Sequence, residues 1–376
     1  MTFHVMIIPT LGCQCNCKYC WGSESTKEMM DINVIDDIIT WLKDFRDDKV
    51  HFTFHGGEPL LAGYDFYAEA LEKLSKIDNL EGFSLQSNIW LLSDELIDLF
   101  LKYNVAVSTS IDGPEEINDY QRAEGYFKKN IGRYERAKEK GLNINFVLTV
   151  TQYSKDYSDE LYEFFKSHGM NLKIHAALPS LRGDNADPWA LDQEEHGKLL
   201  IDWLDKYLYD LDKFSVMDLD HIAKSTFRRR GTLCTFADCI GTTLAVGADG
   251  SIYPCYRFVG MDEYILGNVK ANPSFDKLKE SDAWAKLQEF REYVDENCAK
   301  CRYVKYCEGG CPYNAILASK TPKAIDPQCV AYKMIFGEVS KRLNKEFAKN
   351  AFGGLNGPGV KKENEAFSIM DLIMKP

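Results

Sequence analysis

The sequence contains no apolar run approaching the roughly 20 residues that a membrane-spanning helix needs. Its N-terminus lacks the charged and apolar regions of a secretion signal, so we expect a cytoplasmic protein. A surplus of basic residues is also missing, because 45 Lys and Arg face 57 Asp and Glu and give a net charge of −12. This balance argues against binding to nucleic acids or to acidic membrane surfaces, where basic patches supply the affinity.

Cysteine is absent from residues 21–233, although the chain of 376 residues contains 12 cysteines. They gather in one group before this stretch and a second group after it. Since cytoplasmic proteins rarely form disulfides, we expect these cysteines to bind metal. The composition, 45% hydrophobic and 27% charged, is ordinary for a globular protein. The length of 376 residues predicts two domains or one large barrel with an appendage.

The first cysteine group is the segment TLGCQCNCKYCW at residues 10–21. It follows an apolar run, residues 3–10, that predicts a strand. Cys13, Cys17 and Cys20 have the spacing C-x3-C-x2-C. Three thiolates can hold three irons of a [4Fe–4S] cube and leave the fourth iron open to chelate a small molecule. Zinc binding is the alternative, because C-x2-C pairs are common in zinc sites.

Strand-like and helix-like segments alternate after this loop. Six such repeats indicate a parallel sheet with helical crossovers, and six rather than eight predict a partial, open (β/α)6 barrel of the TIM type. Chemistry in such folds gathers at the C-terminal ends of the strands. The predicted strands after the first are 50–55, 82–88, 105–111, 143–150 and 171–177, and the clearest predicted helices are 33–47, 64–76, 94–102 (with Ser93 as N-cap) and 159–167.

Polar motifs follow three of these strands. In the first, HGGEP at residues 55–59, two glycines allow close approach of the backbone to a ligand and Pro59 fixes the turn. The others are QSN at 86–88 and STSIDGP at 108–114. Taken singly, each motif is also typical of a plain turn or a polar strand end.

Together with the cysteine loop, these motifs resemble the radical S-adenosylmethionine (radical SAM) superfamily. There the open iron binds the amino and carboxylate groups of SAM, and an electron from the cluster cleaves a C–S bond to give a 5′-deoxyadenosyl radical. The resemblance implies that the backbone of the GGEP turn receives the SAM ammonium. Arg122 is a candidate partner of the SAM carboxylate, because an arginine fork suits carboxylates, or else a surface arginine. The implied SAM-binding residues are Tyr19, His55, Gly56, Gly57, Glu58, Ser87, Asn88, Ser110 and Arg122.

The second cysteine group reads C-x4-C-x15-C, then C-x2-C-x5-C-x3-C, then a lone cysteine. Alternating residues around Asp249-Gly250 predict a β-hairpin that returns Cys255 towards Cys239. A zinc ribbon or two structural zinc ions are the alternative interpretation.

The whole pattern resembles the SPASM extension of radical SAM enzymes, a small α+β domain with two auxiliary [4Fe–4S] clusters. The resemblance implies one cluster on Cys234, Cys239, Cys255 and Cys311, and another on Cys298, Cys301, Cys307 and Cys329. With the first group, this uses every cysteine except Cys15, which we interpret as a bystander, the alternative being that it forms a hydrogen bond near the cluster.

Three sequence regions are predicted. They are a radical SAM barrel at 1–215, a SPASM domain at 216–345, and a glycine-rich linker with an amphipathic tail at 346–376. In the tail, Phe367, Met370 and Met374 share one helical face, and Ile369, Leu372 and Ile373 share another. A surface-docked or disordered tail is compatible with this pattern, and so is a lid or an internal substrate-like segment.

SPASM enzymes modify peptides or proteins, and in the sulfatase-maturing branch an aspartate follows the cysteine equivalent to Cys255. Tyr256 stands here, and because a tyrosine titrates near ~10 it is a poor base at neutral pH. We therefore predict modification of a ribosomally made peptide or protein by crosslinking, thioether formation or oxidation. The alternatives are a formylglycine-generating sulfatase maturase, an enzyme acting on a small molecule, and a non-catalytic electron carrier.

The predicted cofactors are SAM and three [4Fe–4S] clusters, and the predicted partners are the peptide or protein substrate and an electron donor such as ferredoxin or flavodoxin. Cys13, Cys17 and Cys20 carry the cleavage of SAM in this prediction. Asp112, Tyr256 and His175 are candidates for the group that deprotonates the substrate.

Overall fold

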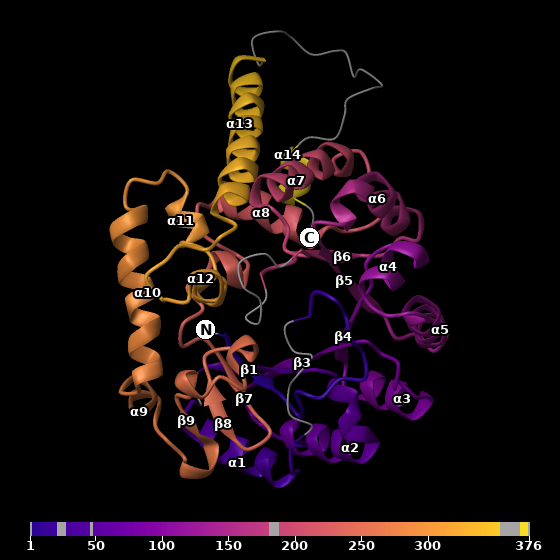
Figure 1. The fold of residues 1–376 in the computed structure, drawn as a ribbon, viewed down its shortest axis with the longest axis vertical. Helices are drawn as coiled ribbons and strands as arrows, with labels where there is room; N and C mark the ends of the chain where they lie inside the picture. Colours follow the sequence, from indigo (N-terminus) through magenta and orange to yellow (C-terminus); the bar gives the residue numbers. More distant parts are fainter. Residues whose placement is uncertain (1, 21–27, 46–47, 180–187, 354–368, 375–376) are drawn as a thin grey trace. The chain divides into compact units, whose positions relative to one another are not determined.

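The computed structural model describes residues 2–20, 28–45, 48–179, 188–353 and 369–374 (Figure 1). The chain forms two compact units. Unit 1 comprises residues 1–147, 180–182 and 239–291, and unit 2 comprises residues 148–179, 183–238 and 292–376. The prediction of an α/β fold with a parallel sheet is confirmed, and the following paragraphs describe each unit by itself.

A largely parallel sheet is the centre of unit 1. Its strands follow the order β5-β4-β3-β2-β1-β7-β8-β9, in which β1 to β5 and β7 run parallel and the last three strands pair antiparallel. Their bounds are β1 Thr2–Ile7, β2 Lys49–Phe54, β3 Leu80–Ser87, β4 Val105–Ser110, β5 Ile144–Val150, β7 Thr243–Val246, β8 Ser251–Tyr253 and β9 Gly267–Asn268.

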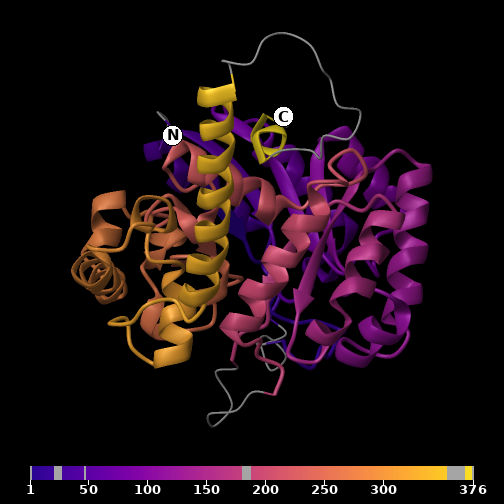
Figure 2. The same cartoon turned by 90° about the horizontal axis from the view of Figure 1, so that it is seen from above.

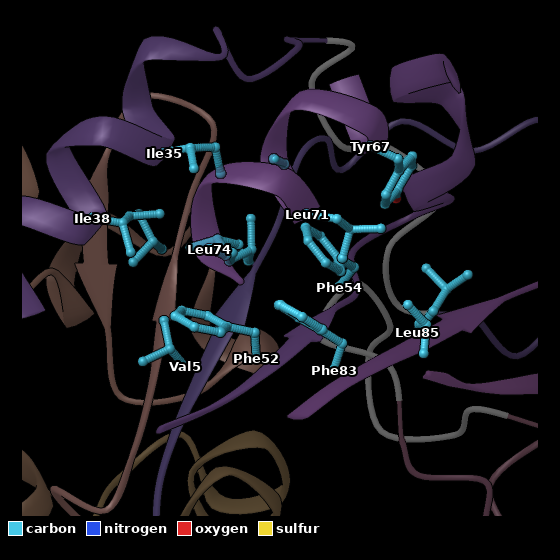
Figure 3. Packing of buried hydrophobic residues seen from close by; sticks show 14 of the residues in the cluster. Val5, Ile35, Ile38, Phe52, Phe54, Tyr67, Leu71, Leu74, Phe83 and Leu85 are labelled. Atoms are coloured by element: carbon cyan, nitrogen blue, oxygen red, sulfur yellow. The ribbon is translucent and has the colours of Figure 1, made fainter. Parts of the chain in front are cut away.

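The hydrophobic core of unit 1 lies between this sheet and the helices that connect its strands. Side chains alternate along each strand, so Val5, Phe52 and Phe83 point to the same face, where Ile38 and Leu74 meet them (Figure 3). Ser93 caps its helix as predicted, because its Oγ accepts a hydrogen bond from the Leu96 N–H at 3.3 Å. The α-helices that lie wholly in unit 1 are α1 Asn33–Trp41, α2 Gly63–Leu74, α3 Asp94–Lys102, α4 Glu115–Gln121, α5 Tyr126–Glu139 and α9 Phe275–Lys279.

The predicted hairpin around Asp249-Gly250 is present, and it extends the barrel sheet. Val246 of β7 pairs with Ile252 of β8, while β7 also lies parallel to β1. The Thr243 N–H donates to the Cys239 carbonyl at 3.2 Å. Since Ala245 pairs with Tyr253, the antiparallel register brings Cys255 to the same end of the hairpin as Cys239.

Unit 2 is mainly helical. The Ala177 N–H donates to the Val150 carbonyl at 2.8 Å, so the end of β6 lies beside the end of β5. Helix α13 packs along α7 and α8. The elements of unit 2 are α6 Ser158–Ser167, β6 Leu172–Ala176, α7 Gln193–Tyr207, α8 Met217–Arg228, α11 Val304–Cys307, α12 Pro312–Ser319, α13 Cys329–Gly353 and α14 Ile369–Met374. The residues of α10, Asp282–Cys298, belong partly to unit 1 and partly to unit 2.

The C-terminal tail packs within unit 2. Ile369, Leu372 and Ile373 of α14 are buried against α8 and α13, and α14 lies beside α13 in Figure 2. Glu346 of α13 caps α14 by accepting hydrogen bonds from the N–H groups of Ile369 and Met370. Phe367 and most of the predicted linker lie outside the described residues. The described part of the tail is therefore docked on α8 and α13, as in the interpretation of a surface-docked tail. Among the described residues, no helix is long and apolar enough to cross a membrane.

A buried histidine makes the stability of unit 2 depend on pH. His196 of α7 donates from Nδ1 to the Gln328 Oε1 at 2.8 Å, and its burial lowers its pKa to about 4. The unfolded chain binds a proton near the ordinary value of 6.5, so stability is fully present above that pH and is lost as the pH falls towards 4. Between ~pH 7.5 and ~pH 5.5 this residue alone should cost about 1 kcal/mol of unfolding free energy.

This prediction is measured by anaerobic denaturant unfolding of reconstituted protein at several pH values. His196→Gln should flatten the loss of stability on acidification. His168→Gln is the matched control, since His168 is an exposed histidine of the same unit, and it should keep the wild-type slope. An unchanged slope in His196→Gln would contradict the assignment.

Candidate functional site

The cysteine loop is held against two other segments of unit 1. The Gly57 N–H donates to the Thr10 carbonyl at 3.1 Å, and the Glu58 N–H donates to the Gly12 carbonyl at 2.8 Å. From the other side, the Lys18 N–H donates to the carbonyl of Gln121, the last residue of α4, at 2.9 Å. The loop that follows β1 is therefore positioned by the turn that follows β2 and by α4.

Two glycines permit this close approach. A Cβ on Gly57 would lie 2.2 Å from the Leu11 carbonyl oxygen, and a Cβ on Gly56 would lie 2.3 Å from the Thr10 carbonyl oxygen. Gly56 also has a φ of +137°, which side chains rarely allow. These glycines were predicted to allow the close approach of a ligand, and the close approach that the structure shows at them is that of the cysteine-loop backbone.

Glu58 is fully buried, and its carboxylate binds the end of β3. It accepts hydrogen bonds from the Ser87 Oγ at 2.7 Å, from the Asn88 N–H at 2.8 Å and from the Leu60 N–H at 2.9 Å. Burial raises its pKa to about 7. Glu58 thus joins the turn after β2 to the motif after β3, and its backbone N–H, not its carboxylate, bonds the cysteine loop.

Polar side chains surround the thiols. The Asn88 Nδ2 lies 4.0 Å from the Cys13 Sγ and 3.4 Å from the Cys15 Sγ, and the Cys15 N–H donates to the Cys13 Sγ at 3.4 Å. A hydrogen bond from the Cys15 side chain lowers the pKa of Cys13 to about 7 and raises the pKa of Cys15. Cys15 therefore makes contacts with Cys13 and Asn88 inside the site, which agrees with the alternative to the bystander interpretation.

The ion pair of Asp112 and Arg122 is the main charged feature beside the loop. Asp112 follows β4 and is fully buried, and its carboxylate faces the Arg122 guanidinium with two contacts of 2.8 Å. The Tyr19 OH donates to the Asp112 Oδ2 at 2.7 Å. Arg122, predicted from the sequence to meet the SAM carboxylate, is thus paired with a carboxylate of its own chain.

Two supporting residues of this site were missed in the sequence. Asn118 accepts a hydrogen bond from the Asp112 N–H at 2.9 Å, and the buried Asn130 donates to the Asn88 carbonyl at 3.0 Å and to the Thr109 Oγ1 at 2.7 Å. Both lie on helices, and no spacing signal distinguishes them from other asparagines. Ser110, which was predicted to contact SAM, accepts a hydrogen bond on its Oγ from the Gln86 Nε2 at 3.1 Å.

Tyr256, which follows Cys255, stacks on His55. Their ring centroids are 4.0 Å apart and the rings are inclined by 26°. The Arg257 Nε donates to the Tyr256 OH at 3.1 Å. The GGEP turn and the segment after the hairpin therefore meet within unit 1.

Four of the cysteines in the second group line one pocket of unit 2. They are Cys298, Cys301, Cys307 and Cys329, the set implied for the second auxiliary cluster. Asp326 supports the neighbouring turn by accepting hydrogen bonds from the Cys311 N–H and the Gln328 N–H, both at 2.8 Å. The sequence analysis missed Asp326, although it lies close to Cys329 in the chain.

The other implied set is divided between the units. Cys239 and Cys255 belong to unit 1, whereas Cys234 and Cys311 belong to unit 2, so each half is described only by itself. His175, the remaining candidate from the sequence, lies on β6 in unit 2.

The donor sets fit iron–sulfur clusters. Thiolates are the usual ligands of such clusters, and N–H donors directed at the ligand sulfurs, as from Asn88 and Arg122, are one means of tuning them. In the part of the chain that the structure describes, no three Cys, His, Asp or Glu side chains are arranged as the site of a single metal ion. A cube of four irons holds its thiolates farther apart than a single ion does.

Known families match both cysteine regions. The family model of the Radical SAM superfamily matches residues 7–165, and that of SPASM, an iron–sulfur cluster-binding domain, matches residues 234–302. An uncharacterized protein of Methanothermobacter thermautotrophicus is 46% identical over 61% of this chain and 89% of its own. The cysteine-type anaerobic sulfatase-maturating enzyme of Clostridium perfringens strain 13 is 24% identical over 88% of this chain and 94% of its own.

The fold has solved counterparts. Native anSMEcpe with bound AdoMet and the Cp18Cys peptide superposes with a TM-score of 0.80 at 24% identity, over 93% of this chain and 100% of that chain. The matched ranges contain the cysteine loop, the GGEP turn and most of the second cysteine group. The chain belongs to the radical SAM superfamily and carries a C-terminal SPASM domain, with SAM and [4Fe–4S] clusters as its cofactors.

Proposed function

We propose that this protein is a radical SAM/SPASM enzyme that modifies a side chain or backbone carbon of a ribosomally made peptide or protein. The stack of Tyr256 on His55 carries the proposal. It places the residue after a proposed auxiliary ligand, Cys255, against the SAM-binding turn. A substrate held beside Tyr256 is then close to both the site of radical formation and an auxiliary cluster.

The residues of unit 1 have distinct roles in this proposal. Cys13, Cys17 and Cys20 hold the SAM-binding cluster, and the backbone of the GGEP turn orients the SAM ammonium. When bound, SAM and this cluster supply the 5′-deoxyadenosyl radical that abstracts a hydrogen atom from the substrate. The proposed polar contacts to SAM come from the strand ends and the loop, namely Tyr19, His55, Ser87, Asn88 and Ser110.

Two auxiliary clusters complete the proposed cofactor set. The pocket formed by Cys298, Cys301, Cys307 and Cys329 would hold one of them. The set of Cys234, Cys239, Cys255 and Cys311 would hold the other, and it would accept an electron from the substrate or ligate the substrate. An electron donor of the ferredoxin or flavodoxin class would supply the reducing electron.

The kind of modification depends on which residue deprotonates the substrate. The relatives include a sulfatase-maturating enzyme, which makes formylglycine formation the second candidate. Tyr256 argues against it, because a tyrosine stands directly after Cys255 where the resemblance to the sulfatase-maturing branch implies an aspartate. We therefore favour a peptide crosslink, a thioether or another oxidative modification.

The test starts with SAM cleavage by anaerobically reconstituted protein and dithionite. We expect 5′-deoxyadenosine, and its absence would favour the non-catalytic electron carrier. Short peptides encoded beside the gene and sulfatase-type peptides with Cys or Ser are then compared by mass spectrometry. A mass change in the encoded peptide only is the expected result, whereas formylglycine in the sulfatase-type peptide would overturn the preference.

A further inference from the structure

The guanidinium of Arg122 has its donors divided between two partners. Its Nη2 donates a hydrogen bond to the Asp112 Oδ1 at 2.8 Å, and its Nε lies 2.8 Å from the Asp112 Oδ2 in a charge contact without a hydrogen bond. The remaining nitrogen, Nη1, lies 3.9 Å from the Cys17 Sγ. The arginine therefore contacts a cluster ligand with the side of the guanidinium that the ion pair leaves available.

The surroundings fix this orientation. Arg122 and Asp112 have side-chain exposures of 7% and 0%, so water does not compete for their contacts. The guanidinium carbon lies 5.6 Å from the ring centroid of Tyr19 and 5.0 Å from that of Tyr126, within the range of cation–π contacts. The Tyr19 OH also donates to the Asp112 Oδ2 at 2.7 Å. Rotation of the guanidinium away from Cys17 would break several of these contacts at once.

A positive charge in this position favours the reduced cluster. Hydrogen bonds to the ligand sulfurs, net charge and solvent exposure set the reduction potential of an iron–sulfur cluster. Charge–charge interactions are stronger in a buried site than in water, because the effective dielectric constant is lower. The Asp112 carboxylate offsets part of the effect of the arginine, so the two side chains act on the potential with opposite signs.

We propose that Arg122 is a positioning residue that raises the reduction potential of the cluster bound by Cys13, Cys17 and Cys20, and that Asp112 and Tyr19 hold its guanidinium at Cys17. This inference rests on the radical SAM assignment and is independent of the peptide substrate. It differs from the interpretation of Arg122 as the partner of the SAM carboxylate, because the carboxylate that Arg122 meets is that of Asp112.

The test is a redox titration of the reconstituted full-length enzyme, monitored by electron paramagnetic resonance. The signal of the SAM-binding cluster is identified because it shifts when SAM is added. Arg122→Gln should make the cluster roughly tenfold harder to reduce, which for a one-electron couple is about 59 mV more negative. Asp112→Asn removes the opposing charge but keeps a side-chain oxygen that can accept the Arg122 Nη2 hydrogen bond, so the guanidinium should stay at Cys17 and the potential should shift in the positive direction. SAM affinity, measured separately, should change little in Arg122→Gln.

A matched control uses the same residue types at the surface. Arg136 and Asp94 also form an ion pair, with exposures of 47% and 43%, and the double variant Arg136→Gln/Asp94→Asn should keep the wild-type potential. The double variant Arg122→Gln/Asp112→Asn leaves no unpaired buried charge and carries the test if Arg122→Gln does not fold. Its potential should lie below that of the wild type, because the charge in contact with Cys17 is lost.

Three outcomes would overturn the proposal. The first is an unchanged potential in both Arg122→Gln and the double variant. The second is a shift of Arg122→Gln and Asp112→Asn in the same direction. The third is a loss of SAM affinity without a change in potential, which would assign Arg122 to the SAM carboxylate. None of these results depends on finding the peptide, so they leave the proposed function to be judged by its own test.

Discussion

Replacing Cys13, Cys17 and Cys20 together by alanine should abolish SAM cleavage and lower the iron content from about twelve to about eight atoms per chain. The reason is that each of the three proposed cubes holds four irons, and only the one in this loop has an iron open to SAM. The eight cysteines of the second group are left intact, so two cubes should remain. Iron analysis and quantification of 5′-deoxyadenosine measure both effects in one preparation.

Cys15→Ala is the matched control for this triple variant. Cys15 lies in the same loop and contacts Cys13 through its own N–H, but it is not an implied ligand. The control should therefore keep about twelve irons. Two results would contradict the ligand assignment, namely SAM cleavage that persists in the triple variant and the loss of about four irons in Cys15→Ala.

The elements of the barrel could be predicted because their signals are local. Alternating apolar residues indicated the strands, and Ser93 indicated the start of α3. The hairpin around Asp249-Gly250 was predicted from its turn residues. Its attachment to β1 was not, because the pairing of Val5 with Leu244 joins segments that are distant in the chain and depends on tertiary packing.

The ligand types of the site could be predicted from spacing, but the partners of its charged residues could not. Glu58 occurs in a motif associated with SAM, yet its carboxylate is fully used by Leu60, Ser87 and Asn88. Arg122 was predicted to meet the SAM carboxylate or to be a surface arginine, and neither prediction named a carboxylate of this chain as its partner. Only the fold determines that Asp112 is the one it meets.

Gly57→Ala should reduce SAM cleavage by about 100-fold or more, since displacing reacting groups by about 1 Å has an effect of this size. The added Cβ would lie 2.2 Å from the Leu11 carbonyl oxygen and 2.4 Å from the Gly12 carbonyl oxygen. Both atoms belong to backbone, so the cysteine loop itself must move. The hydrogen bond from the Glu58 N–H to the Gly12 carbonyl would be strained or lost with that movement.

Gly132→Ala is the control for this substitution. Gly132 lies on α5, and a Cβ there would have no atom within 4 Å apart from its chain neighbours and the adjacent backbone of its own helix. Alanine is the better helix former by up to about 1 kcal/mol, so this variant should cleave SAM at the wild-type rate and be slightly more stable. The measurements are the initial rate of 5′-deoxyadenosine formation and the thermal unfolding of both variants. A wild-type rate in Gly57→Ala would show that close contact between the GGEP turn and the cysteine loop is not needed for the reaction.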